Sequence, residues 1–240
     1  MPRILILNGN TTASVTELVA RHVRTEIGTG FDLKLATARF GARYISTEAS
    51  YAIAAHSALD CLAEHGADCD SVLLACFGDP GLFALREVSA APVVGLAEAA
   101  MHEAAQHGRY SIVTGGVLWK VMLERLAHAL GLSESIASIR PITWTGDRIA
   151  ADPEGALKFL AEETRRAASE DGAQAVILGG AALAGLAARI APAVNIPVID
   201  SVLAGARAAG RLAIAARPSR PAMTPTPTDG ISPALARLLG

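Results

Sequence analysis

Aromatic residues make up only 4% of this 240-residue chain, and its three cysteines include no CxxC pair. An odd number of cysteines without that spacing argues against a disulfide framework and against a zinc site, so we predict no bound metal. Lysine and arginine (21 residues) nearly balance aspartate and glutamate (23) and are interspersed with them, which leaves no basic stripe. We therefore expect neither a nucleic acid nor a membrane as a partner.

Long apolar runs are also missing. The longest uncharged apolar stretch, residues 175–188, is shorter than the ~18–20 residues of a membrane-spanning helix and is interrupted by glycines. The apolar run near the N-terminus, in MPRILILNGN, is too short for a signal peptide. Neither GxGxxG nor GxxxxGK[ST] occurs, which argues against a dinucleotide-binding or P-loop fold. These absences predict a soluble, cytoplasmic protein.

The sequence does contain an internal repeat. Residues 70–100 align with residues 174–205, with one residue inserted before the second proline. RILILNGN near the start matches RYSIVTGG, which begins at Arg109. Two similar halves of this kind predict a cleft between them, in which one small molecule meets groups from both sides. The repeat is imperfect at one place of chemical interest, because Cys76 aligns with Gly180.

Short buried strands alternate with helices in both halves. The predicted strands are 3–8, 32–37, 71–75, 92–95, 110–113, 136–142, 174–178 and 197–199. The predicted helices are 12–27, 47–66, 80–88, 96–107, 117–131, 153–169, 183–190 and 201–211. This alternation implies an α/β fold of two pseudo-symmetric halves, each with a parallel sheet and helices on both faces.

The repeat also sets the predicted domain boundaries. We place the first half at residues 1–107 and the second at residues 108–212. Residues 213–230 are rich in proline and threonine and are expected to form an extended linker. The final residues, ISPALARLLG, are amphipathic and predict a short helix. We expect the whole segment 213–240 to pack back on the first half.

Loops that follow the strands carry the candidate site. Ligands of open parallel sheets bind beyond the carboxyl ends of strands, where helix N-termini and unpaired amides converge. These loops contain no arginine or lysine, so backbone amides and hydroxyls must bind the ligand's oxygens, which favours a neutral or singly charged small molecule. The candidate catalytic residue is Cys76, and the candidate substrate-binding residues are Asn8, Asn10, Thr11, Phe77, Gly78, Thr114, Gly115, Gly179, Gly180 and Ala181.

Cys76 has two interpretations. A free cysteine at a strand end is commonly a small buried hydrophobe. Alternatively, Asp79 caps a helix that begins at Pro80, and the amides of that helix point toward Cys76 and lower the pKa of its thiol. We interpret Cys61 and Cys69 as structural. Glu98 and Asp200 follow the matched PV strands, where each can cap a helix or orient a thiol.

Four motifs resemble the aspartate/glutamate/hydantoin racemase superfamily, and hydantoin and allantoin racemases in particular. They are ILNGNT, LLACFGDPGL, PVVGLAEAA, and ILGGAALAGLA followed by PVIDSV, and the resemblance runs over residues 2–212. It implies a cofactor-independent racemase or epimerase that acts at the carbon α to a carbonyl, in a small amino-acid derivative such as a 5-substituted hydantoin. In that family two cysteines, one from each half, flank the stereocentre. The resemblance also implies a homo-oligomer.

The chain departs from the family at the second cysteine. Cys76 matches the first cysteine, but Gly180 stands where the family's LGC-A-G pattern has the second. Asn10 and Thr11 match the family's substrate-contacting loop, and Thr114-Gly115 matches a position where many relatives have two threonines. A cysteine at Gly180 would restore the second thiol, at a cost of about 1 kcal/mol if the glycine has positive φ.

The missing thiol leaves three functional hypotheses. In the first, the chain is a racemase in which water or another side chain replaces the second acid. One strong base and a set of amides could suffice, because the flanking carbonyl and ring stabilise the enolate of a hydantoin. In the second, one cysteine protonates an enediolate after loss of carbon dioxide, as in cofactor-free malonate decarboxylases. In the third, the protein is a non-catalytic small-molecule binder. We favour the first, because the loops around Cys76 are intact.

Overall fold

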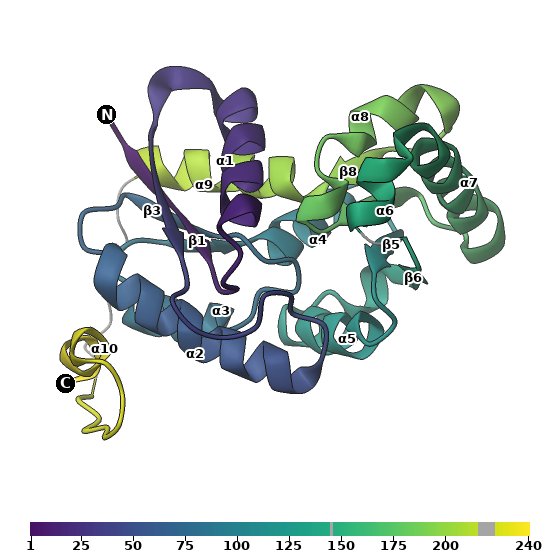
Figure 1. The fold of residues 1–240 in the computed structure, drawn as a ribbon. Helices are drawn as coiled ribbons and strands as arrows, with labels where there is room; N and C mark the ends of the chain where they lie inside the picture. The colour runs from purple at the N-terminus through teal and green to yellow at the C-terminus, as the bar shows by residue number, and fades with distance from the viewer. Residues whose placement is uncertain (145, 216–223) are drawn as a thin grey trace. The chain divides into compact units, whose positions relative to one another are not determined.

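Two compact units make up the chain, and each contains one four-stranded sheet. The computed structural model describes residues 1–144, 146–215 and 224–240 (Figure 1). The first unit comprises residues 1–95 and 206–240, and the second comprises residues 96–205. Every described strand pair is parallel. The predicted α/β fold with two pseudo-symmetric parallel sheets is therefore confirmed.

The sheet of the first unit has the strand order β2-β1-β3-β4. Its strands are β1 (Arg3–Asn8), β2 (Asp32–Thr37), β3 (Ser71–Leu74) and β4 (Val93–Gly95). Its helices are α1 (Ala13–Ile27), α2 (Glu48–His65) and α3 (Leu82–Val88), with a short 3-10 turn, η1 (Gly28–Gly30), after α1. In the register of the sheet Asn8 lies beside Thr37, and Leu7 lies beside Leu74. The carboxyl ends of neighbouring strands therefore meet at one edge.

Alternating side chains of β1 and β3 form the core under α2 and α3. Leu5 and Leu7 of β1 and Val72 and Leu74 of β3 are fully buried and belong to one cluster with residues of these two helices. α1 packs against β1 and β2, and Figure 1 shows it on the other side of the sheet from α2 and α3. Burial on both faces explains why the strands are continuous apolar runs such as ILIL, because neither face is left to polar side chains.

The second unit repeats the same topology, with the strand order β6-β5-β7-β8. Its strands are β5 (Tyr110–Gly115), β6 (Ile136–Ile142), β7 (Ala175–Gly179) and β8 (Val198–Asp200). Its helices are α4 (Leu96–Ala105), α5 (Trp119–Ala129), α6 (Gly146–Ala151), α7 (Pro153–Asp171) and α8 (Leu186–Ile190). Three 3-10 turns complete it: η2 (Ser133–Ser135), η3 (Ala181–Leu183) and η4 (Ala191–Ala193). None of the helices in the described part of the chain is long and apolar enough to span a membrane.

The helix that follows the last strand of each sheet belongs wholly or partly to the other unit. α4 follows β4 directly, yet it packs against β7 and β8 of the second unit. α9 (Ser201–Ile214) begins in the second unit, and its residues from 206 onward belong to the first. There Ser71 Oγ of β3 donates a hydrogen bond of 3.0 Å to the Ala209 carbonyl, and Arg207 pairs with Glu26 of α1 at 2.6 Å. Packing contacts therefore divide the chain into its two units after residues 95 and 205.

The C-terminal helix α10 (Pro233–Leu239) packs against α2 of the first unit. Ser232 caps it, because its Oγ accepts a 3.1 Å hydrogen bond from the Leu235 amide. Leu238 and Leu239 contact the core cluster beneath α2. The expected linker, residues 213–230, lies partly outside the described residues, which omit 216–223.

An ion pair between the exposed Arg39 and a buried carboxylate fixes the segment between β2 and α2. Asp60 of α2 is almost fully buried, and its carboxylate accepts hydrogen bonds from Arg39 Nε at 2.7 Å and Arg39 Nη2 at 3.1 Å. This hydrogen bonding by Arg39 holds the pKa of Asp60 below its usual range, although burial acts in the opposite direction. The pair therefore anchors the start of the loop of residues 38–47.

We predict that Asp60→Asn lowers the free energy of unfolding at neutral pH by roughly 1–3 kcal/mol, the range for hydrogen bonds to charged groups. Because the folded-state pKa of Asp60 is the lower one, this stabilisation is present above the unfolded-state pKa and is lost as the pH falls through the folded-state value. Urea unfolding at a series of pH values should show the difference between variant and parent shrinking in acid.

Asp32→Asn is the matched control, since the Arg3–Asp32 pair is also short, at 2.6 Å, but its side chains are 41% and 45% exposed. Exposed pairs contribute little, so its effect should be the smaller of the two. An effect of Asp60→Asn no larger than that of Asp32→Asn would contradict the role given to the buried Asp60 carboxylate.

Candidate active site

The loop after β1 is held by the side chains of its own asparagines. Asn8 is completely buried, and its Nδ2 donates hydrogen bonds of 3.0 Å to both Asn10 Oδ1 and Thr16 Oγ1. Its Oδ1 accepts from the Asn10 amide at 3.0 Å, and Asn10 Oδ1 accepts from the Thr12 amide at 2.9 Å. The Thr11 amide donates to the Ala42 carbonyl at 3.1 Å, which ties this loop to the segment 38–47. The predicted residues Asn8, Asn10 and Thr11 thus form one ordered turn.

Cys76 begins the neighbouring loop, which follows β3. The Ala75 amide still bonds to the Leu7 carbonyl at 2.7 Å, so Cys76 stands at the first position beyond the sheet. A tight turn follows, closed by a 3.1 Å hydrogen bond from the Asp79 amide to the Cys76 carbonyl. Tyr51 of α2 supports this turn by donating to the Gly78 carbonyl at 3.0 Å. Since β1 and β3 are adjacent, the first unit brings all its predicted site residues to one edge.

The expected helix start at Pro80, with Asp79 as its N-cap, is wrong. α3 begins at Leu82, and its N-cap is Gly81, which has a φ of 82° and makes no side-chain capping bond. Asp79 itself has a φ of 54°, in the left-handed region, whereas an N-cap residue is extended. Its fully buried carboxylate lies instead against Gly95 at the end of β4, where any Cβ would overlap it.

The expected lowering of the Cys76 pKa is also wrong. Burial raises the pKa of the Cys76 thiol well above its usual range, and the negative charge of Asp79 raises it further. Tyr44 lies within electrostatic reach as well, because its pKa is raised by partial desolvation and then by the charge that Cys76 carries when ionised. At neutral pH Cys76 is therefore a thiol, which has a proton to give and must lose it before it can act as a base.

Tyr44 and Asp79 are the neighbours of Cys76 that sequence reasoning missed. Asp79 does carry a signal, its place in the loop after Cys76, but the sequence around it favours a helix cap. Tyr44 carried none, because it belongs to the irregular segment 38–47, whose position depends on the Arg39–Asp60 pair and on the Thr11–Ala42 hydrogen bond.

In the second unit side-chain hydrogen bonds fix the ends of β5, β7 and β8. The buried Thr114 at the end of β5 donates from Oγ1 to the Gly179 carbonyl at 2.9 Å, so its hydroxyl proton is engaged. Gly115 is the last residue of β5, and Ala181 opens η3. Asp200 at the end of β8 accepts from the amides of Val202 at 2.9 Å and Leu203 at 3.2 Å. Its other carboxylate oxygen accepts from the Gly185 amide at 2.6 Å, so Asp200 caps α9 and fixes the loop before α8.

Gly180 has a backbone conformation that only glycine adopts readily. Its φ is 118° and its ψ is 150°, and its amide donates to Ser201 Oγ at 3.2 Å. A Cβ built there would meet no atom within 4 Å, so space is available but the backbone is unfavourable for other residues. Cys76 has no positive φ, because Asp79 is the one non-glycine residue with that property in the described chain. The two aligned positions thus differ in backbone as well as in side chain.

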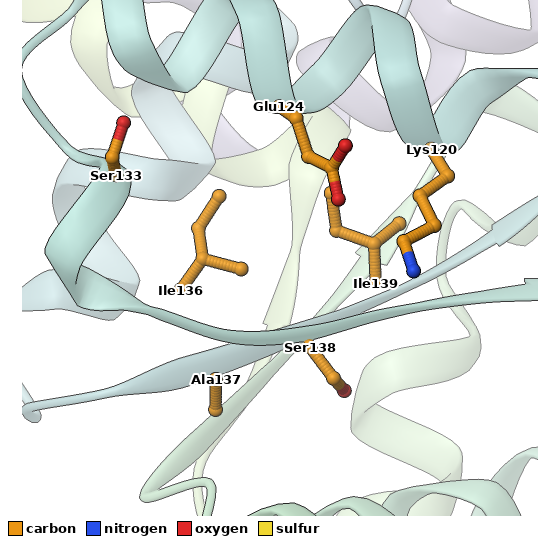
Figure 2. A pocket seen from close by; sticks show the side chains of 7 residues that line it. All are labelled: Lys120, Glu124, Ser133, Ile136, Ala137, Ser138 and Ile139. Atoms are coloured by element: carbon orange, nitrogen blue, oxygen red, sulfur yellow. The ribbon is translucent and has the colours of Figure 1, made fainter.

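A cavity of about 400 Å³ lies elsewhere, between α5 and the edge strand β6. Figure 2 shows Glu124 and Lys120 extending from α5 toward the side of β6 that carries Ile136 and Ile139. Ser138, which also lines it, donates to Asp171 at 2.5 Å, so its hydroxyl is engaged. None of the predicted site residues lines this cavity. No group of three or more His, Cys, Asp or Glu side chains placed to hold a metal occurs in the residues that the structure describes.

Comparison with known proteins places the chain near racemases. The model of the Asp/Glu/hydantoin racemase family matches residues 4–209. A hydantoin racemase of Pseudomonas sp. (strain NS671) is 31% identical over 85% of this chain and 83% of its own length. A hydantoin racemase of Paenarthrobacter aurescens is 32% identical over 88% of this chain and 90% of its own. The crystal structure of allantoin racemase from Pseudomonas fluorescens superimposes with a TM-score of 0.82 at 29% identity, over 92% of this chain and 99% of that one.

We predict that Asp79→Asn increases the reactivity of Cys76, because removing the carboxylate charge lowers the pKa of the thiol. Alkylation by iodoacetamide at mildly alkaline pH, followed by mass spectrometry in a Cys61→Ala, Cys69→Ala background, reports the thiolate fraction. A fall of half a pKa unit would speed alkylation about threefold. Asp200→Asn removes an equally buried carboxylate from the second unit and should leave the rate unchanged. An unchanged or slower rate in Asp79→Asn would refute the electrostatic link.

A second prediction concerns the conformation of Gly180. We expect Gly180→Ala to lower the free energy of unfolding by roughly 1–3 kcal/mol, more than the sequence suggested, because this region of φ and ψ is accessible essentially to glycine alone. Gly30→Ala is the control, since a Cβ there also meets nothing within 4 Å but no positive φ opposes it. Equal effects of the two substitutions in urea unfolding would show that Gly180 can relax without strain.

Proposed function

We propose a specific reaction for this chain, which belongs to the Asp/Glu/hydantoin racemase family and is a racemase. It interconverts the enantiomers of a small cyclic amino-acid derivative, such as a 5-substituted hydantoin or allantoin, without a cofactor. The observation that carries the proposal is the place of Cys76, the first residue beyond β3, in a chain similar to hydantoin and allantoin racemases over more than four fifths of its length.

Cys76 is the proposed acid/base. Its thiolate removes the proton from the carbon α to the carbonyl, and the electron pair of that C–H bond moves onto the carbonyl oxygen to form an enolate. Protonation of the planar enolate on the opposite face gives the other enantiomer. Because burial and Asp79 raise the pKa of Cys76, the thiolate is scarce at neutral pH but is a strong base when it forms. The rate should therefore rise as the pH increases into the alkaline range.

Backbone amides of the Cys76 loop are the proposed binding groups for the carbonyl oxygen. The amides of Phe77 and Gly78 donate to no acceptor among the described residues, although both residues are buried. A buried amide without a partner is costly, and an oxygen atom of the substrate would satisfy it. Two such donors beside the base would stabilise the charge that develops on the enolate oxygen.

Neither the decarboxylase nor the non-catalytic binder gains support from an observation of this structure. The similar proteins named above are racemases, and the loop that carries Cys76 is ordered by the hydrogen bonds already described. The cytoplasmic location and the homo-oligomeric state expected from the sequence stay predictions.

We predict that Cys76→Ala abolishes exchange of the α-proton while the fold is retained. The enantiomers of several 5-substituted hydantoins and of allantoin would be incubated in D₂O, with deuterium at the stereocentre read by NMR and corrected for the spontaneous rate. Cys61→Ala is the control, because burial raises the pKa of Cys61 to about 12 and leaves it inert in the core. Near-normal exchange in Cys76→Ala would remove Cys76 from the mechanism.

A further inference from the structure

Tyr44 leaves its aromatic ring in solvent, unlike the other two tyrosines of the chain. It is 66% exposed, whereas Tyr110 is completely buried and the Tyr51 hydroxyl donates to the Gly78 carbonyl at 3.0 Å. Among the residues that the structure describes, the Tyr44 side chain has no hydrogen bond or ring contact. A tyrosine that serves the packing of its own protein is usually buried with its hydroxyl bonded, so the ring of Tyr44 is available to a ligand.

Hydrogen bonds on one side and burial on the other hold the backbone that carries this ring. The Ala42 carbonyl accepts from the Thr11 amide at 3.1 Å, and the Arg43 carbonyl accepts from Thr12 Oγ1 at 2.8 Å. The residue after Tyr44 is buried. Because the backbone is held in this way, a contact made by the ring costs little conformational entropy. Tyr44 is therefore presented by an ordered segment directly beside the predicted substrate-binding loop after β1.

The ring also lies close to the reacting thiol, which belongs to the same unit. Partial desolvation raises the pKa of the Tyr44 hydroxyl, and so does the charge that Cys76 carries when ionised. Such an effect acts only over a short distance, because salt screens charges that are more than about 10 Å apart. Phe77, the aromatic residue next to Cys76, is buried and offers no free ring surface. Tyr44 thus provides an accessible aromatic surface beside the thiol.

The substituent of a 5-substituted hydantoin begins at the carbon that loses its proton. A base that reaches this C–H bond therefore lies close to the first atoms of the substituent as well. A benzyl or indolylmethyl group extends further by the width of an aromatic ring, far enough to contact a side chain that neighbours the base. A methyl group does not extend so far, and the ureido group of allantoin is polar. Contact with a ring therefore distinguishes aromatic substituents from small and polar ones.

We infer that the Tyr44 ring contacts the C5 substituent of the substrate and makes the protein select hydantoins with an aromatic substituent. This inference rests on the proposed function, because it names the substrate class of the same site. Tyr44 is a specificity-determining residue and takes no part in proton transfer. Its contact with the substituent is the same before and during the loss of the α-proton, so it acts on KM rather than on kcat.

Exchange of the α-proton in D₂O with 5-benzylhydantoin and with 5-methylhydantoin tests the inference, after correction for the spontaneous rates. In the parent we expect kcat/KM to be about tenfold higher with the benzyl compound, the factor that corresponds to one aromatic contact. Tyr44→Ala should lose most of this factor through a higher KM, whereas Tyr44→Phe should retain it, because the ring makes the contact. Leu35→Ala is the matched control and should leave the ratio unchanged, since Leu35 is also an exposed apolar residue of the first unit but lies within β2, beside Ile6.

The outcomes separate the two proposals. No exchange in the parent protein with any hydantoin or with allantoin would refute the proposed function. Exchange with an unchanged benzyl-to-methyl ratio in Tyr44→Ala would overturn the role of Tyr44 alone, and so would an equal loss in Tyr44→Phe, which indicates the hydroxyl. A parent protein that prefers allantoin or 5-methylhydantoin would overturn it without any variant, so the inference stays testable if Tyr44→Ala does not fold.

Discussion

Parallel pairing of strands that are buried on both faces is the constraint on which the rest of this structure depends. Because neighbouring strands run in the same direction and in fixed register, the chain emerges from each sheet at one edge, at Asn8 and Cys76 in the first unit and at Gly115 and Gly180 in the second. Beyond that edge, the backbone amides and carbonyls of the loops can no longer form the hydrogen bonds of the sheet. Side chains such as Asn8, Thr114 and Asp200 supply those hydrogen bonds and give each loop its form.

Each half has a buried carboxylate at the ends of its strands, but the two carboxylates come from positions that do not align. In the first unit Asp79 comes from the loop, and its carboxylate fills the space that Gly95 leaves at the end of β4. In the second unit Asp200 occupies the position aligned with Gly95 and reaches the Gly185 amide of the loop. A negative charge therefore stands close to the thiol in the first half, and in the second half the Asp200 carboxylate accepts hydrogen bonds from backbone amides.

The sequence was sufficient for the strands and for the two repeated parallel sheets, because apolar runs and glycine turns are local signals. It failed where tertiary contacts override local preference. The left-handed backbone of Asp79 and the start of α3 at Leu82 accompany the packing of the Asp79 carboxylate against Gly95, a contact that no local pattern encodes. The raised pKa of Cys76 depends on burial and on a charge whose direction of approach is set by the same packing. Alignment identified Gly180 as unusual, but only the hydrogen bond to Ser201 shows what stands beside it.

Because α9 runs from the second unit into the first, it affects the order in which the two units can fold during synthesis. When the ribosome has synthesised every strand of both sheets, the Ser71 hydroxyl in the middle of the first sheet still lacks its acceptor, because Ala209 has not yet been added. Gly210, which packs near Ile27 and Phe31, has not been added at that stage either. The first unit, although its strands are translated first, completes its core only after the second unit has received all of its own residues.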